Sequence, residues 1–214
     1  MSSSINMSSS QYYQRVCHLI EGDAFRMECL QALEQLALPQ GYIGAGFLRN
    51  AIWDDLHGKK TSTPLNDVDV IYFDAHVLNT SFVSNISHTL NPSDSVNRER
   101  EQDLAFQEQL NALLPGVNWQ VKNQARMHVL HDHAPYKDCE DAISYWIERE
   151  TCVAIALSTV NQFDILAPFG LAHNFKGQIS INPKLPRYEI FNKRVTDKKW
   201  CDIWPQLKVV APQA

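Results

Sequence analysis

The chain has 214 residues, of which 44% are hydrophobic and 20% charged, with a formal net charge of −5. This composition excludes an intrinsically disordered protein, and the net acidity disfavours a dedicated nucleic-acid binder. No apolar run is long enough for a transmembrane helix, the first ten residues do not resemble a secretory signal, and the five cysteines show no C-x-x-C spacing, so a reducing, cytoplasmic setting is expected.

The N-terminal part predicts a tail followed by a helical hairpin. Residues 1–10 are rich in serine and are expected to be disordered. Apolar residues recur at helical spacing over residues 11–38, with a break at Gly22 and Asp23. We expect residues 11–214 to form one domain with a helical extension at its C-terminal side.

A strand, a glycine turn and a helix follow. The apolar pair Tyr42 and Ile43 leads into G-A-G at 44–46, and helical spacing then continues to Gly58. The sequence D-V-D-V-I-Y-F-D at 67–74 predicts a buried strand.

The rest of the chain alternates helices and strands. Residues 75–97 are polar and predict a loop or insertion. Further helices are expected near 95–114, 138–148 and 186–205, and strands at 117–122, 151–158, 162–167 and 178–182, with 151–158 and 162–167 forming a hairpin. The pattern, which has no internal repeat, predicts an α/β (α+β) fold.

The glycine turn and the two aspartates together describe a site for a nucleoside triphosphate. Glycines let the backbone approach a phosphate, and the following helix N-terminus offers free N–H groups and a partial positive charge. Side chains alternate along a strand, so Asp67 and Asp69 point to one face, roughly 6.5–7 Å apart. Two such carboxylates can bind Mg²⁺, which prefers oxygen ligands and phosphate partners. The alternative is a pair of solvated aspartates at the entry of a strand.

These motifs resemble the nucleotidyltransferase superfamily of DNA polymerase beta. In tRNA CCA-adding enzymes and bacterial poly(A) polymerases, a motif G-G-x-V-R-D-x-L-x-G precedes the motif D-x-D, and the two motifs of this chain follow the same order. The nearer resemblance is to a bacterial family of nucleotidyltransferase-like proteins. Its marks run from about residue 40 to 207, and they read G-F-L-R-N-x-I-W-D-x-L-H-G, D-V-D-V-I-Y-F-D, W-Q-V-K-N-Q-A-R-M-H, P-Y with D-A-I-S-Y-W, A-P-F-G-L and K-R-V-x-x-K-x-W-x-x-x-W-P.

The resemblance implies a polymerase-beta-type nucleotidyltransferase fold, which is a small mixed sheet flanked by helices. It also implies that Gly44 and Gly46 form the phosphate turn and that Asp67 and Asp69 hold Mg²⁺ or Mn²⁺. Arg49 matches the nucleotide-site arginine of the tRNA nucleotidyltransferase motif, whereas Asn50 replaces the aspartate of that motif.

The superfamily also carries a third carboxylate on a later strand. The strand at 117–122 has no acid, so the resemblance leaves three readings open. Asp164 has the apolar flanks of such an acid and is our candidate catalytic residue, Glu148 is a second candidate, and the site can also lack a third acid. In the last case the chain would be a nucleotide binder or a degenerate enzyme.

Basic residues supply candidates for holding phosphate. Lys122 and Arg126 lie at the end of a predicted strand, where they would contact the triphosphate or remain solvated. Residues 176–214 carry 8 Lys and Arg against 3 Asp and Glu. We expect this end, with Lys193, Arg194 and Lys198, to form either a positive wall facing the Asp67 region or a solvated helix.

Other conspicuous residues are expected to be structural. The histidines at 128, 131 and 133 predict a polar loop rather than a zinc site. Four tryptophans are expected in the core or between helices, and these are Trp119, Trp146, Trp200 and Trp204.

The expected function is metal-dependent nucleotidyl transfer from a nucleoside triphosphate, with ATP the first choice and pyrophosphate the leaving group. The acceptor would be a small molecule or a protein, and the acidic net charge makes RNA the least favoured. The alternative is a non-catalytic nucleotide-binding or interaction module that keeps the same fold.

Overall fold

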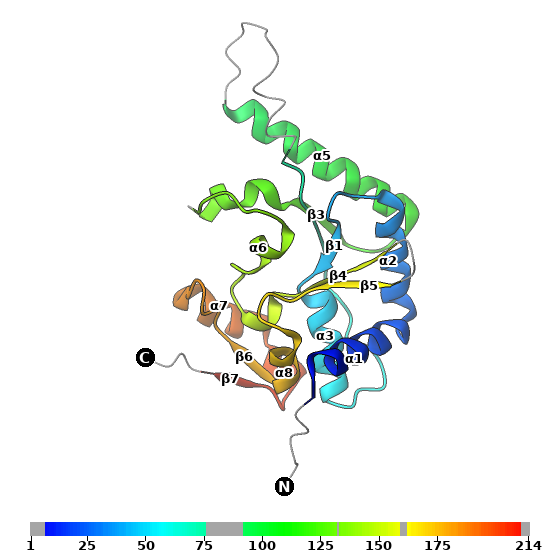
Figure 1. Cartoon of the computed structure of the whole chain (residues 1–214), viewed down its shortest axis with the longest axis vertical. Helices are drawn as coiled ribbons and strands as arrows, with labels where there is room; N and C mark the ends of the chain where they lie inside the picture. Colours follow the sequence, from blue (N-terminus) through cyan, green and yellow to red (C-terminus); the bar gives the residue numbers. More distant parts are fainter. Residues whose placement is uncertain (1–6, 76–91, 132, 159–161, 211–214) are drawn as a thin grey trace, which may run out of the picture.

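The structure is a computed structural model that describes residues 7–75, 92–131, 133–158 and 162–210 (Figure 1). Its first helix, α1 (Ser9–Glu21), begins inside the segment predicted to be a tail. The Ser8 hydroxyl accepts from the Gln11 N–H at 3.3 Å, and the Gln11 side chain accepts from the Ser8 N–H at 2.7 Å. This reciprocal cap fixes the start of the helix. The prediction of a disordered tail over residues 1–10 was therefore wrong for Ser9 and Ser10, which are helical. Residues 1–6 lie outside the described ranges.

A mixed five-stranded sheet forms the centre of the protein, with strand order β3-β2-β1-β4-β5. Strand β2 pairs in parallel with β3, while β1–β2, β1–β4 and β4–β5 are antiparallel. The strands are β1 (Tyr42–Gly44), β2 (Val68–Tyr72), β3 (Trp119–Asn123), β4 (Ala154–Leu157) and β5 (Phe163–Leu166). Each was predicted from sequence, and the α/β fold class is confirmed.

One face of the sheet is covered by helices. Helices α1, α2 (Ala24–Leu36), α3 (Gly46–Leu56) and α5 (Pro92–Leu113) contribute to one large core. This core holds the residues of β2 at even positions, such as Val70, together with Ile43 and Ile155 from the neighbouring strands. The alternation of side chains along a strand therefore sends Asp69 to the other face.

The other face of the sheet is partly covered by α6 (Cys139–Ile143). Cys139 and Ile143 pack on Tyr42, Ile71 and Ala154. The helix is shorter than predicted, because the chain leaves it after Ile143 and continues through turns to the 3-10 helix η2 (Arg149–Thr151). Beyond the end of α6 the face remains open around Asp69.

The C-terminal region departs most from expectation. The single helix predicted near 186–205 is two helices, α7 (Tyr188–Lys198) and α8 (Trp200–Ile203), broken at Lys199, whose φ is 49°. A strand that was not predicted, β7 (Lys208–Val210), pairs in parallel with β6 (Gln178–Ser180). Two further 3-10 helices complete the chain, η1 (Gln124–His131), where a polar loop was expected, and η3 (Leu171–Lys176).

Tryptophans join this region to α3. The ring centroid of Trp53 lies 5.8 Å from that of Trp200 and 5.2 Å from that of Trp204, and both pairs are edge-to-face. Such pairs stabilise by about 0.5–1.5 kcal/mol beyond the area that they bury. The segment that carries the basic residues is thereby held next to the N-terminal half of the fold. Within the described ranges, no helix combines the length and the apolar character needed to cross a membrane.

Candidate functional site

The two aspartates of the D-V-D motif lie at the start of β2. Asp67 immediately precedes the strand and is exposed, and Asp69 is half-buried on the open face of the sheet. The partner of Asp69 across the parallel ladder is Gln120 of β3. The neighbouring strand therefore places an amide beside Asp69 and no second carboxylate.

The environment of Asp69 disfavours its ionised form. Burial raises the pKa of Asp69, and the nearby Asp67 carboxylate raises it further, while Lys122, Lys198 and Arg49 act in the opposite direction. A bound cation at this position would reduce the repulsion between the two carboxylates and favour their ionised forms.

A polar cavity of about 320 Å³ opens at these carboxylates. We call it the polar cavity. It is lined by both aspartates, by the first residues of α3 and by three cationic side chains, namely Arg49, Arg194 and Lys198. A helix N-terminus, two carboxylates and three cations thus surround one volume, although they come from positions far apart in the sequence.

The turn at 44–46 has its special backbone geometry at the residue between the two glycines. Ala45 has φ 55° and ψ −118°, which is the conformation that favours glycine at the first central position of a type II′ turn. A Cβ on Gly44 would come within 2.8 Å of Cη2 of Trp146, so Gly44 is required by the packing of an indole ring. A Cβ on Gly46 would meet only ordinary contacts, the nearest at 3.5 Å from Nη2 of Arg49, and Gly46 lines the polar cavity.

The strain at Ala45 has a measurable consequence. Replacing Ala45 with glycine should raise the free energy of unfolding by about 1 kcal/mol, because relief of the backbone strain exceeds the added entropy of the unfolded chain. Chemical denaturation measures this change. Ala51→Gly, in the middle of α3, is the matched control and should lower stability by about 1 kcal/mol. A loss of stability in Ala45→Gly would contradict the strain.

Arg49 is a fixed wall of the polar cavity. Its guanidinium packs against the rings of both Trp53 and Trp200, with 4.8 and 4.7 Å from Cζ to the ring centroids. It donates to the Thr151 hydroxyl at 2.7 Å and to the Asn50 side-chain oxygen at 3.0 Å, whereas its buried Nε has no hydrogen-bond partner among the residues that the structure describes. Burial lowers the pKa of Arg49 to about 10, so the side chain remains a cation at neutral pH.

The basic C-terminal helix supplies two more cations. Arg194 forms a bidentate ion pair with Glu148, at 2.6 Å from Nε to Oε1 and 3.1 Å from Nη2 to Oε2. Glu148 is only 1% exposed. Glu148, the second candidate for a third acid, therefore serves to hold Arg194 at the cavity. Lys198 also lines the cavity, whereas the side chain of Lys193 is 77% exposed and pairs with Asp197. The positive wall thus involves Arg194 and Lys198 and leaves Lys193 outside.

The structure does not bring Asp164 and Arg126 to the polar cavity. Asp164 lies on β5, with β4 and β1 between it and β2, and its carboxylate accepts from the Tyr42 hydroxyl at 2.7 Å. Arg126 forms an ion pair with Asp103, which also accepts from the Tyr72 hydroxyl at 2.8 Å. The roles predicted for Asp164 and Arg126 therefore gain no support from their positions.

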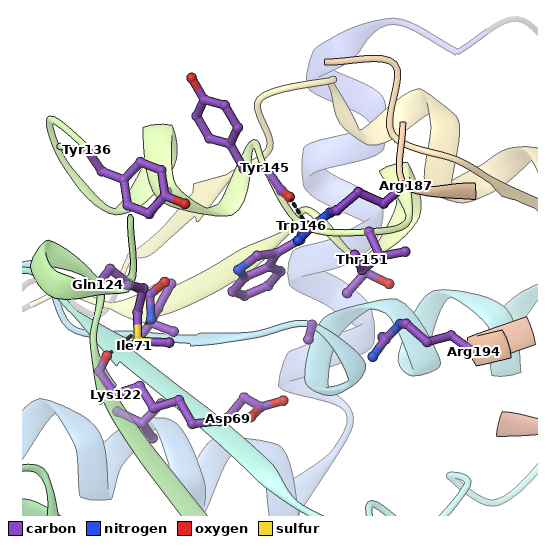
Figure 2. Close-up of a pocket in the computed structure, with 15 residues that line it drawn as sticks. Asp69, Ile71, Lys122, Gln124, Tyr136, Tyr145, Trp146, Thr151, Arg187 and Arg194 are labelled. Atoms are coloured by element: carbon purple, nitrogen blue, oxygen red, sulfur yellow. Dashed lines mark hydrogen bonds between the residues drawn. The ribbon is translucent and has the colours of Figure 1, made fainter. Parts of the chain in front are cut away.

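A second cavity, of about 350 Å³, adjoins the first (Figure 2). We call it the aromatic cavity. It shares Ala45, Asp69, Thr151 and Arg194 with the polar cavity. Its other walls include Lys122 and the aromatic side chains Tyr136, Tyr145 and Trp146. Sequence reasoning placed Trp146 in the core and assigned no role to the two tyrosines, although both stand in the motifs P-Y and D-A-I-S-Y-W that carry the family resemblance.

The donor set at Asp67 and Asp69 fits a magnesium ion. In the part of the chain that the structure describes, no group of three or more His, Cys, Asp or Glu side chains is close enough to hold a metal by itself. Mg²⁺ is commonly held by one or two carboxylates, with waters and substrate phosphates as its other ligands. Two oxygen-bearing side chains next to a cationic cavity meet that requirement.

Comparisons with known proteins identify a family and a fold. A family described as nucleotidyltransferase matches residues 31–209. An NMR structure described as revealing a CCA-adding enzyme head domain is 26% identical, with a TM-score of 0.72, and the match covers 93% of this chain and 96% of that one. A structure of a CCA-adding enzyme with CTP shares the fold at 12% identity and a TM-score of 0.53, over 96% of this chain and 44% of that one. No curated protein matches the chain.

Proposed function

The chain belongs to the nucleotidyltransferase family, whose match covers most of its length, and from this premise we propose that the protein transfers a nucleotidyl group from a nucleoside triphosphate to an acceptor hydroxyl, with pyrophosphate as the leaving group. The observation that carries the proposal is the polar cavity. It brings together a helix N-terminus, Asp67 with Asp69, and the cations Arg49, Arg194 and Lys198.

The carboxylates would hold the metal. Asp67 and Asp69 would bind Mg²⁺ or Mn²⁺ together with oxygens of the triphosphate. A divalent ion in this position would neutralise charge on the reacting phosphate and on the leaving group. It would also relieve the repulsion between the two carboxylates, which adds to the effect of burial in raising the pKa of Asp69.

The remaining walls would bind and orient the triphosphate. The free N–H groups at the start of α3, around Gly46, favour an anion. Arg194 and Lys198 would balance the charge of the phosphates that leave, and Arg49 adds a cation that Trp53 and Trp200 hold in place. Lys122, which lines the aromatic cavity beside Asp69, would contribute charge from the other side.

A non-catalytic nucleotide-binding module is the second candidate. It is favoured by one observation, namely that β3 places Gln120 next to Asp69 where an enzyme of this kind would gain a further acid. If the protein is an active nucleotidyltransferase, the acceptor would be a small hydroxylated molecule or a protein side chain, and the acidic net charge disfavours RNA.

Thermal unfolding together with a pyrophosphate assay tests the proposal. Mg²⁺ and ATP together should raise the melting temperature more than either does alone, because binding to the folded state adds RT ln(1 + [L]/Kd) to stability. Pyrophosphate should then accumulate when mixtures of hydroxylated metabolites or proteins are supplied. Absence of any shift with all four nucleoside triphosphates would refute nucleotide binding, and a shift without pyrophosphate would favour the binding module.

Gly46 tests the phosphate turn. Gly46→Val should weaken binding of Mg²⁺–triphosphate by about 10-fold or more, because a branched side chain would occupy part of the polar cavity at the helix N-terminus, where the loss of a charge-assisted contact is worth about 1.5–3 kcal/mol. Calorimetric titration measures the affinity, and circular dichroism checks the fold. Gly46→Ala is the graded control, since its Cβ finds only ordinary contacts. Equal affinity in a folded Gly46→Val protein would remove the turn from the phosphate site.

A further inference from the structure

The aromatic cavity contains chemistry that the phosphate site does not use. Trp146, Tyr145 and Tyr136 contribute rings to its walls, and Gln124 contributes a carboxamide. In Figure 2 the indole of Trp146 lies between Asp69 on one side and Tyr145 on the other, with Gln124 and Lys122 to one edge. Flat ring systems stack on aromatic side chains, and a carboxamide can both donate and accept a hydrogen bond.

The side chain and the backbone of Trp146 are both fixed by contacts within the protein. Its indole lies against Gly44, where any larger residue would collide with Cη2. The buried side chain of Asn182 donates to the carbonyl oxygens of Trp146 and Ser144, both at 2.7 Å. Both ends of the residue are therefore fixed, and the ring is prepared for a ligand before one binds.

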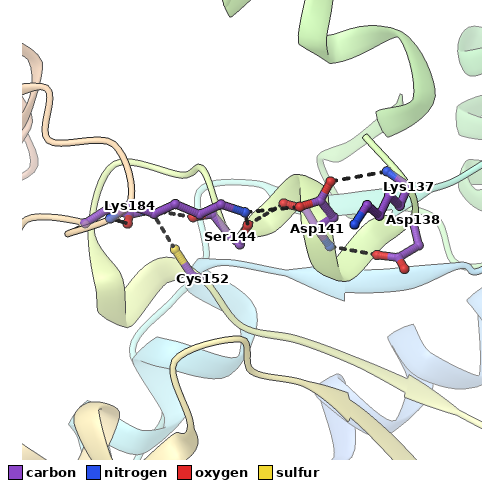
Figure 3. A network of polar contacts seen from close by, with 7 residues as sticks. Lys137, Asp138, Asp141, Ser144, Cys152 and Lys184 are labelled. Atoms are coloured by element: carbon purple, nitrogen blue, oxygen red, sulfur yellow. Dashed lines mark hydrogen bonds and ion pairs between the residues drawn. The ribbon is translucent and has the colours of Figure 1, made fainter. Parts of the chain in front are cut away.

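A second set of contacts fixes the segment that carries these aromatic residues (Figure 3). The ammonium of Lys184 donates to the Ser144 hydroxyl at 2.6 Å and to Asp141 at 3.1 Å, and it lies 3.7 Å from the ring centroid of Tyr145. The Arg187 guanidinium donates to the Tyr145 carbonyl oxygen at 2.6 Å. These contacts join the end of α6 to the chain after β6 and hold this wall of the aromatic cavity in position.

The two cavities are adjacent and share four lining residues. Both are lined by Ala45, Asp69, Thr151 and Arg194. A ligand with an anionic end in the polar cavity can therefore extend past Thr151 into the aromatic cavity. The two volumes differ in chemistry in the same way as the two ends of a nucleoside triphosphate.

We propose that the aromatic cavity binds the base of the nucleoside triphosphate, with the base stacked on Trp146 and its edge at Gln124. This inference rests on the proposed function, since it takes the polar cavity to hold the phosphates. Lys122 reaches the same region and adds a donor next to the carboxamide. The ribose lies at Thr151, where the two cavities meet.

The test compares ligands with and without a base. Each of the four nucleoside triphosphates and inorganic tripolyphosphate is titrated calorimetrically in the presence of Mg²⁺. At least one nucleoside triphosphate should bind about 5- to 100-fold more tightly than tripolyphosphate, which is the range expected for stacking of one base. Trp146→Leu should remove most of this difference and leave the tripolyphosphate affinity unchanged.

Two further variants secure the result. Trp146→Phe keeps an aromatic ring and should keep most of the difference, which separates stacking from a general loss of structure. Tyr188→Leu alters an aromatic residue that is 50% exposed on α7, and it should change neither affinity.

Three outcomes would overturn the inference. If tripolyphosphate binds the parent as tightly as every nucleoside triphosphate, the base makes no contact, and the phosphate site alone stands. If Trp146→Leu weakens both ligand types equally, or neither, Trp146 is not the stacking surface. If neither ligand type binds the parent, the proposed function and the inference fail together.

Discussion

Asp69→Asn should reduce nucleotidyl transfer by about 10²- to 10⁴-fold, because several kcal/mol of charge stabilisation depend on the metal that this carboxylate would hold. The same variant should lose most of the rise in melting temperature that Mg²⁺ and triphosphate give to the parent. Without metal its stability should stay level or increase slightly, because the substitution removes repulsion from Asp67.

The pH dependence of stability gives an independent reading of the same residue. Burial and Asp67 raise the pKa of Asp69 in the folded protein above the ordinary value of 3.8. The stability that this shift contributes is complete below pH 3.8 and is lost as the pH rises through the raised folded-state pKa. In metal-free solution, denaturation of the parent should show this loss above pH 3.8, and Asp69→Asn should not.

Matched variants decide what a negative result means. Asp67→Asn should lose the metal-dependent rise in the same way, whereas Glu28→Gln, which alters an exposed carboxylate on α2, should behave like the parent. Equal shifts with Mg²⁺ and triphosphate in all four proteins would show that the D-V-D pair is not a metal site.

Arg194→Gln should lower the free energy of unfolding by about 3 kcal/mol, because it leaves the buried Glu148 carboxylate without its charged partner. The value lies at the lower end of the range for broken buried pairs, since the Arg194 side chain is 34% exposed. Triphosphate affinity should also fall, by about 10-fold, because the substitution removes a cation that lines both cavities. Denaturant unfolding and calorimetric titration measure the two effects.

The neighbouring residue provides the control. Lys193→Gln removes the same charge from the same helix, but its pair with Asp197 is exposed on both sides. Surface pairs of this kind contribute about 0–1 kcal/mol, so stability should change by no more than that. A similar loss in both variants would mean that the helix responds to net charge and not to the Glu148 pair.

The sequence predicted the part of the site that is continuous along the chain. The strand that ends at Gly44, the helix that begins at Gly46 and the D-V-D strand follow one another over about thirty residues, and each has its own local pattern of apolar and turn residues. The predictions for β1, α3 and β2 therefore agree with the structure. The same locality explains the pairing of β4 with β5 as a hairpin.

The sequence did not predict pairings between distant segments. Strand β7 has only three residues and exists because it pairs with β6, thirty positions earlier, which no local periodicity can reveal. Candidate residues were also ambiguous for this reason. Asp164 and Glu148 were candidates for a third acid and Arg126 for a phosphate contact, but their partners Tyr42, Arg194 and Asp103 are set by the fold.

The order in which the chain is synthesised gives the position of α7 a further meaning. A ribosome releases the start of α3, the D-V-D pair and the strands of the sheet before Arg194 and Lys198 emerge. Until then Glu148 lacks its ion-pair partner Arg194, and Trp53 lacks the two rings that pack against it. A nascent chain can therefore assemble its carboxylates while the cationic wall is still missing. Competence to hold a triphosphate arises only after α7 has been synthesised.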